Sequence, residues 1–301
     1  MDTISVRQAL PEDAEEIAAL YCKVWKSGYP FKDIFEPEYV RNLLDKEKDA
    51  WYTAWVGDKC IGSSVGVVDV ANKSAELGRT AIDKKYRGSG IGKTLAEKVR
   101  DELLEGDVEL LWGYLRNKAI YQISKNDGLI AVGHTEYLIF KERDLFLLGL
   151  GLTPSSKKKR VKSTVNEIYK LESVQKISKD MNLESKVGEY PEEVITAVGF
   201  HGQPTSLNGI YYEPNKGVTI TSIFQKELPK FLQATILVDK LEAIDFFKKL
   251  NFSITAFLPG WFHKNNRRYD CILLTNSLTS SKIQDKTLIP IMEKLREGFK
   301  R

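Results

Sequence analysis

Cysteine and histidine are scarce and dispersed in this sequence. Its 301 residues include only three of each. They are Cys22, Cys60 and Cys271, and His134, His201 and His263. No two cysteines have the spacing of a disulfide framework or a zinc site, as is typical of proteins from a reducing compartment. No two histidines have the helical spacing of metal ligands. We therefore expect no metal.

Long apolar runs and a strong charge of one sign are also missing. The first residues lack the charged-then-apolar pattern of a secretory signal, and no stretch is long enough to span a membrane. The net charge of +4 favours anionic ligands slightly without demanding nucleic acid. We expect a cytoplasmic protein with no nucleic-acid or membrane partner. Its oligomeric state is open.

The length and composition predict two globular domains. With 42% hydrophobic and 29% charged residues, 301 positions supply apolar material for two cores. The first half reads as strand, helix, three-stranded meander, helix, strand, helix and two strands, which indicates a mixed α/β fold over residues 1–152. The expected strands are 4–9, 51–56, 60–70, 75–82, 110–115, 130–140 and 144–150.

The second half is less regular. Residues 153–163 contain the run Lys157-Lys158-Lys159-Arg160, which indicates either a basic linker or a phosphate-binding patch. We expect the second domain to span residues 164–301 and to end in a helix near residue 290. Its expected strands are 194–199, 209–212, 218–224, 233–238, 253–257 and 271–275, with a helix over 239–250.

A glycine-rich turn lies between the strand over 75–82 and the next helix. Its sequence is Tyr86-Arg87-Gly88-Ser89-Gly90-Ile91-Gly92. A helix start leaves backbone N–H groups unpaired and carries the positive end of the helix dipole, so it attracts phosphate. Glycine allows positive φ and a close approach of the backbone. The turn therefore predicts a pyrophosphate site, with Arg87 or Lys93 adding charge.

Two well-known phosphate motifs fit this turn poorly. A Walker A loop ending in Gly92-Lys93-Thr94 needs glycine five residues before Gly92, and Arg87 stands there. The dinucleotide fingerprint is matched by Gly88 and Gly90, but its third glycine position holds Lys93.

The segment from Ala81 to Leu95 instead resembles the coenzyme A-binding motif of the GNAT N-acetyltransferase superfamily. Arg87, Gly90 and Gly92 take the motif positions, and Asn117 to Gly128 resembles the family's later helix. The resemblance implies an acetyl-CoA N-acyltransferase fold in which one strand pairs with the pantetheine arm and polarises the thioester carbonyl. The implied acetyl-CoA-binding residues are Thr80, Ala81, Ile82, Arg87, Gly88, Ser89, Gly90, Ile91, Gly92, Lys93, Thr94 and Asn117.

The same resemblance suggests the catalytic groups. An amine must lose a proton to attack, and Glu76 is the candidate base, although in many relatives the glutamate sits nearer the position of Gly78. Many relatives protonate the departing thiolate with a tyrosine four residues before the exit glycine. Here that position is Ser124, and Tyr121 lies one turn earlier. We assign the role to either.

Trp25, Tyr29 and Phe31 follow the first helix, where the family usually builds acceptor walls. They are candidate substrate-binding residues or plain core. The expected function is transfer of an acetyl group from acetyl-CoA to a primary amine of a small molecule or peptide. The alternative is a non-catalytic acyl-CoA-binding sensor or scaffold protein.

The second half resembles a partial copy of the same family. The helix over 243–250 and the following Asn251-Phe252 are similar to the family's later helix and exit. Phe247 stands where a tyrosine is expected, and no glycine-rich turn precedes the helix. We therefore predict a tandem protein whose second, degenerate domain lacks a phosphate cradle.

Overall fold

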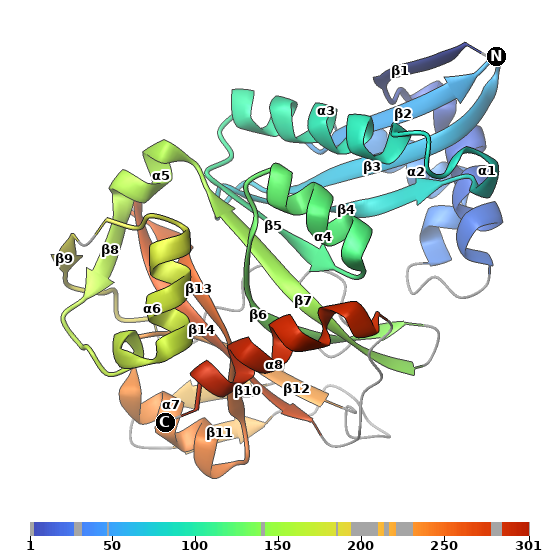
Figure 1. Cartoon of the computed structure of the whole chain (residues 1–301). Helices are drawn as coiled ribbons and strands as arrows, with labels where there is room; N and C mark the ends of the chain where they lie inside the picture. The colour runs from blue at the N-terminus through green and yellow to red at the C-terminus, as the bar shows by residue number, and fades with distance from the viewer. Residues whose placement is uncertain are drawn as a thin grey trace.

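One large β-sheet runs through the molecule (Figure 1). The computed structural model describes residues 3–26, 32–46, 48–139, 142–184, 186–193, 210–213, 217–220, 231–277 and 285–300. Within them the sheet has twelve strands. Their order is β1 (Ile4–Gln8), β2 (Ala50–Val56), β3 (Lys59–Asp69), β4 (Ser74–Ile82), β5 (Leu110–Leu115), β7 (Glu142–Leu152), β6 (Ile130–Ile139), β13 (Ser253–Lys264), β14 (Arg267–Ser277), β8 (Arg160–Ser163) and β9 (Val187–Gly188), with β12 (Phe231–Leu237) also beside β14.

Most neighbouring strands are antiparallel. The parallel pairs are β4 with β5, β14 with β8, and β8 with β9. This confirms the mixed α/β class that the order of elements in the first half predicts.

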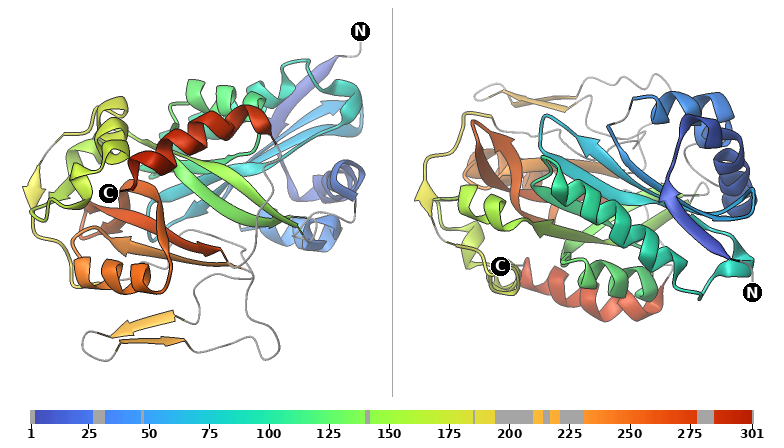
Figure 2. Two further views of the ribbon diagram at one scale, coloured as in Figure 1. Left: turned by 60° about the horizontal axis from the view of Figure 1, so that its bottom comes forward. Right: turned by 90° about the horizontal axis from the view of Figure 1, so that it is seen from above.

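Helices cover both faces of the first half of the sheet (Figure 2, right). On one face lie α3 (Ile91–Glu105), α4 (Lys118–Asn126) and α8 (Ile289–Gly298), and on the other lie α1 (Ala14–Trp25) and α2 (Pro37–Leu44). The α3 helix buries Ile91, Leu95, Val99 and Leu103, the four-residue apolar stripe evident in the sequence.

The second half contains a strand, helix, strand, strand unit like one in the first half. In the first half β5, α4, β6 and β7 follow in sequence, and the sheet order is β5-β7-β6. In the second half β12, α7 (Leu241–Lys249), β13 and β14 follow in sequence, and β14 lies between β12 and β13. The two units meet at β6 and β13. A separate hairpin, β10 (Ile210–Glu213) with β11 (Gly217–Ile220), completes this half, and the strand expected at 194–199 lies outside the described residues.

The two halves join at Gly133. This residue pairs with Ala256 of β13, and a Cβ atom at position 133 would lie 2.2 Å from the carbonyl oxygen of Thr255. Only glycine fits so close an approach of two backbones. The largest buried cluster accordingly spans both halves, from Leu110 to Phe299.

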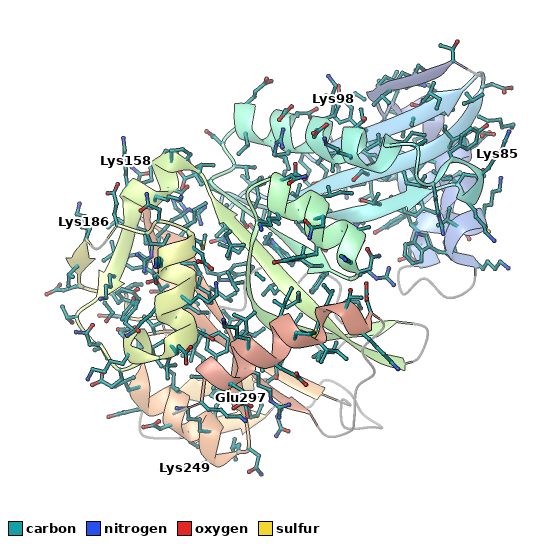
Figure 3. The ribbon with its side chains drawn as sticks, in the orientation of Figure 1. Lys85, Lys98, Lys158, Lys186, Lys249 and Glu297 are labelled. Atoms are coloured by element: carbon teal, nitrogen blue, oxygen red, sulfur yellow. The ribbon has the colours of Figure 1, made fainter. Side chains whose placement is uncertain are left out.

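Residues 153–163 fold against both halves. They form α5 (Pro154–Lys159), which Thr153 caps, and β8. Lys157 donates to the carbonyl of Met181 at 2.6 Å, and Lys159 and Arg160 pair with buried carboxylates. Lys158 extends outward from α5 (Figure 3). Three of the four basic side chains are therefore engaged inside the protein rather than presented together to a phosphate.

Candidate active site

The glycine-rich turn connects β4 to α3. Gly88 and Gly90 have φ of 81° and 89°, and a Cβ atom at either position would meet nothing within 4 Å. Gly90 is the N-cap of α3. The left-handed backbone is therefore what requires glycine at these two positions, and the space above them is open.

The N–H groups of this turn are available to a ligand. Among the described residues, none of the N–H groups from Gly88 to Gly92 donates to a protein acceptor, whereas Arg87 N–H donates to the carbonyl of Lys84. The α3 dipole adds partial positive charge at the same place. The turn therefore has the donor set that a pyrophosphate needs.

Side chains around the turn are mostly exposed. Arg87 Nε donates to the carbonyl of Ile82 at 3.1 Å, which fixes the guanidinium at the end of β4. Ser89 Oγ donates to the Tyr86 carbonyl at 2.6 Å, and Lys93 Nζ lies 3.7 Å from Glu97. Figure 3 shows Lys85 at this end of the molecule. The cradle is thus basic at its rim.

Strands β4 and β5 separate next to this turn. They pair in parallel only from Ser74 with Leu110 to Glu76 with Trp112, although both strands continue. At Gly113, just past the last pair, a Cβ atom would lie 2.7 Å from the Leu77 carbonyl, so the strands are still in close contact there. Beyond it the facing edges of the two strands form no further pairs among the described residues, and we call this unpaired stretch the opening.

A β-bulge shapes β4 beside the opening. Gly78 pairs with Val65 and Ala81 pairs with Ser63, so two residues, Arg79 and Thr80, oppose a single residue of β3. Arg79 has a φ of 49°, and its carbonyl accepts a hydrogen bond from the buried Tyr21 Oη of α1. Such bulges re-aim the backbone next to functional sites.

The predicted acetyl-CoA residues of β4 lie in this bulge or directly after it. Thr80 Oγ1 lies 2.9 Å from Ser64 Oγ, Ala81 is buried, and Ile82 packs beside Ile91. The strand therefore leads from Glu76, past the opening, to the glycine-rich turn.

Glu76 lies at the closed end of the opening. Its partners on the neighbouring strands are Val67 of β3 and Trp112 of β5, so all three side chains share the face that α1 covers. Burial raises the pKa of Glu76 to about 7, and the positive charge of Arg79 opposes that rise only in part. A carboxylate in this state is half-ionised near neutral pH, as a general base requires.

Aromatic rings line the same face. The Trp112 ring makes edge-to-face contacts with Tyr114 and with Trp261 of β13, both at 5.6 Å between centroids. Tyr114 contacts Phe146 at 6.1 Å. The two-residue spacing of Trp112 and Tyr114 on one strand is the signal in the sequence that their side chains share a face.

The candidate acceptor wall is described in part. Trp25 lies 4.8 Å from the Arg116 guanidinium, which also lies 5.7 Å from the Phe146 ring. Trp25 therefore faces the end of β5. Tyr29 and Phe31 lie outside the described residues.

Helix α4 carries the remaining candidates. Asn117 is its N-cap, with the side chain accepting from Ile120 N–H at 2.9 Å, so the capping contact engages the side-chain oxygen. Tyr121 packs against the shared core, and the Ser124 carbonyl accepts from Leu129 N–H at 2.9 Å. The Lys118 N–H donates to Asp285 at 2.8 Å, which ties α4 to the C-terminal segment.

The described residues contain no group of three or more His, Cys, Asp or Glu side chains that could hold a metal ion. None of their helices is long and apolar enough to cross a membrane.

Comparison with known proteins assigns part of the chain to a family. Residues 14–122 match the family model described as Acetyltransferase (GNAT) family. These residues contain the turn, the opening and Glu76. This part of the chain is therefore similar to the GNAT acetyltransferases.

The curated proteins that are similar to this chain also match only part of it. N-alpha-acetyltransferase 30 from Homo sapiens is 30% identical over 107 residues, which cover 33% of this chain and 30% of the relative. The Xenopus laevis protein of that name is 29% identical over 107 residues, 33% of this chain and 39% of the relative. The chain thus spans about a third of the length of these relatives.

Solved structures similar to the chain are acetyltransferases too. A GNAT-family acetyltransferase from Streptococcus pneumoniae is 21% identical, covers 50% of this chain and 99% of its own, and has a TM-score of 0.44. A PaiA N-acetyltransferase from Thermoplasma acidophilum, in complex with coenzyme A, is 17% identical, with 50% and 99% coverage and a TM-score of 0.41.

Proposed function

We propose that the protein is an N-acetyltransferase that transfers the acetyl group of acetyl-CoA directly to a primary amine. The observation that carries the proposal is the arrangement along β4. One strand bears Glu76 beside the opening and ends at the phosphate turn. Because the base and the pyrophosphate site lie on one rigid strand and its turn, the distance between the Glu76 carboxylate and the bound acetyl-CoA is fixed.

The proposed acetyl-CoA site is formed mainly by backbone groups. The residues from Arg87 to Thr94 would hold the pyrophosphate through the free N–H groups and the α3 dipole. Thr80, Ala81 and Ile82 would accompany the pantetheine arm along the unpaired edge of β4, and Asn117 would border it from α4. When bound, the thioester supplies an activated acyl carbon.

Glu76 would act on the acceptor. The Glu76 carboxylate takes one proton from the acceptor ammonium, directly or through water, and the nitrogen–carbon bond then forms as the carbon–sulfur bond breaks. The second proton that the nitrogen loses balances the one that the departing thiolate gains. The acetyl oxygen would receive a hydrogen bond from an N–H of β4.

The thiolate needs a proton or a hydrogen bond as it leaves. Ser124 and Tyr121 of α4 are the two candidates, and we propose no choice between them. Comparing Tyr121→Phe with Ser124→Ala assigns the role, because the variant that lacks the donor loses kcat more than it changes KM.

The acceptor we propose is an amine of a small molecule or a peptide. The identity with N-alpha-acetyltransferase 30 supports testing peptide α-amines first. The partly exposed aromatic rings of Trp25 and Tyr114 would supply the apolar contacts of such an acceptor. A cytoplasmic setting without nucleic acid fits this proposal.

A non-catalytic acyl-CoA sensor is the second candidate, because a serine stands where a tyrosine is expected. Release of free CoA thiol with a panel of amines separates the two. The enzyme releases thiol with at least one amine, and Glu76→Gln lowers kcat/KM by about 100-fold or more. A sensor binds acetyl-CoA tightly and releases none. Calorimetric binding of ATP instead of acetyl-CoA would refute both.

We also propose that residues 164–301 form a degenerate copy of the first domain, after the linking segment 153–163. The support is the shared order of the unit β12, α7, β13 and β14 with β5, α4, β6 and β7. Because the described residues of this half include no counterpart of the turn between β4 and α3, we expect one molecule of acetyl-CoA per chain.

A further inference from the structure

The second half of the chain contacts the start of β4 through Asn72. This side chain is 3% exposed. Its Nδ2 donates to the carbonyl of Trp261 at 2.9 Å, and its Oδ1 accepts from His263 N–H at 2.9 Å. The two bonds mimic strand pairing and fix Trp261 beside the first residues of β4.

Arg268 of β14 reinforces this contact from a fully buried position. Its guanidinium donates to the carbonyls of Asn72 and Lys73 at 2.7 and 2.9 Å, and to Glu109 at 2.9 Å. Lys73 and Glu109 directly precede β4 and β5. One buried cation from the second half therefore holds the closed end of the opening between the strands.

Trp261 packs at this junction against Trp112 of β5. Its ring contacts Trp112 at 5.6 Å with an interplanar angle of 67°, and both tryptophans are almost wholly buried. Trp112 is in turn the β5 partner of Glu76. Trp261 of the second half thus contacts the residue that pairs with Glu76 across β4 and β5.

We infer that Trp261 is a positioning residue, which holds Trp112 against the Glu76 side chain and excludes water from it. The inference rests on the proposed role of Glu76 as base, and it gives the second half a part in catalysis. Among the described residues the neighbours of Glu76 on β3 and β5 are the uncharged Val67 and Trp112. Arg79 is the charged group that acts on it. Water exclusion is therefore the main control on its proton affinity.

The test follows the carboxyl of Glu76 directly. Protein labelled with carbon-13 at glutamate carboxyls is titrated by NMR, and Glu76→Gln identifies the resonance. In wild type we expect the midpoint at about 7. In Trp261→Leu we expect it to fall by about one pH unit or more, because Trp112 loses its support and water enters. We expect the pH at which kcat/KM falls on the acid side of its pH profile to shift by the same amount. An unchanged midpoint would overturn the inference.

Phe257→Leu is the matched control. Phe257 is also on β13, is fully buried and makes an edge-to-face contact with Tyr169 at 6.1 Å. This variant loses similar core packing away from Trp112, so we expect a lower Tm and an unchanged midpoint. An equal shift in both variants would mean that general loosening, rather than the Trp261 contact, moves the midpoint.

Two further outcomes distinguish failure of the Trp261 inference from failure of the proposed role of Glu76. Should Trp261→Leu not fold, Trp261→Phe keeps a smaller ring, and a midpoint equal to that of wild type would overturn the inference. Full turnover by Glu76→Gln, together with a lowered midpoint in Trp261→Leu, refutes the base and leaves the positioning contact intact.

Discussion

The carboxylate of Glu76 lies over Gly78, with Oε1 only 3.2 Å from the position that a Cβ atom of residue 78 would occupy. The two residues are one pleat apart on β4, so their side-chain directions share a face. In the GNAT resemblance the glutamate is expected nearer position 78. The glycine leaves room for a glutamate one pleat earlier to lean toward that place.

Gly78→Ala tests this relationship. The new methyl group needs no positive φ, but it is too close to Oε1, so the carboxylate must move. We expect kcat to fall roughly tenfold or more, within the range attributed to a misplaced base, while KM for acetyl-CoA changes little. Gly106→Ala is the control, because its methyl group would meet only ordinary contacts, the nearest at 3.6 Å. Unchanged turnover in Gly78→Ala would mean that the carboxylate acts elsewhere.

Glu76→Gln is expected to stabilise the protein while it reduces activity. The carboxyl has a pKa of about 7 in the folded state and an ordinary value of 4.5 otherwise. Between these pH values the folded chain retains a proton that the unfolded chain releases, so rising pH destabilises wild type and not the variant. The variant's advantage should grow from pH 4.5 to 7, then level off at about 1–2 kcal/mol, since Glu76 is only half-buried. Urea unfolding of both proteins at pH 5 and pH 8 measures the difference in their free energies of unfolding. An advantage that is the same at both pH values contradicts the raised pKa.

Gly90→Ala separates backbone strain from ligand binding. At a φ of 89° an alanine is strained by roughly 1–2 kcal/mol, and relaxation of the turn would turn its N–H groups away from the pyrophosphate. We expect weaker binding of acetyl-CoA by calorimetry. Gly57→Ala, in the turn between β2 and β3, has a φ of 59° and equally open surroundings. It should show a similar loss of stability with unchanged binding. Equal loss of affinity in both variants would exclude the turn as the specific cradle.

The sequence was sufficient for features that depend on local conformation. Gly88 and Gly90 were identifiable because a left-handed turn before a helix needs glycine, and the apolar stripe of α3 because burial repeats every four residues. The contact between Trp112 and Trp261 could not be predicted from the sequence. These residues are 149 positions apart (261 − 112), and only the order of strands in the sheet brings them together. Local reasoning also could not show that α3 and α1 lie on opposite faces, which decides that Glu76 and Trp112 share one side.

Arg268→Met should be the most destabilising of these substitutions. The side chain is fully buried, and its loss leaves the carbonyls of Asn72, Lys73 and Gly260 without that donor. Burial raises the pKa of Glu109, but Lys159 and Arg268 together hold it below its ordinary value, so in the variant one cation fewer balances a buried carboxylate. Breaking such a pair costs about 3–5 kcal/mol. Chemical denaturation gives the free energy of unfolding.

The control for this prediction is a surface pair. Lys176 and Asp180 form an exposed i,i+4 pair on α6 (Glu172–Asp180), so Lys176→Met should change stability by less than about 0.5 kcal/mol. Because Arg268 holds the closed end of the opening, we also expect Arg268→Met to weaken acetyl-CoA turnover at temperatures where the variant is still folded. If Arg268→Met lowers the free energy of unfolding by about 3–5 kcal/mol but keeps full turnover, the contact of Arg268 with Asn72, Lys73 and Glu109 has a structural role only. A loss no larger than that of Lys176→Met would mean that the halves do not depend on this guanidinium.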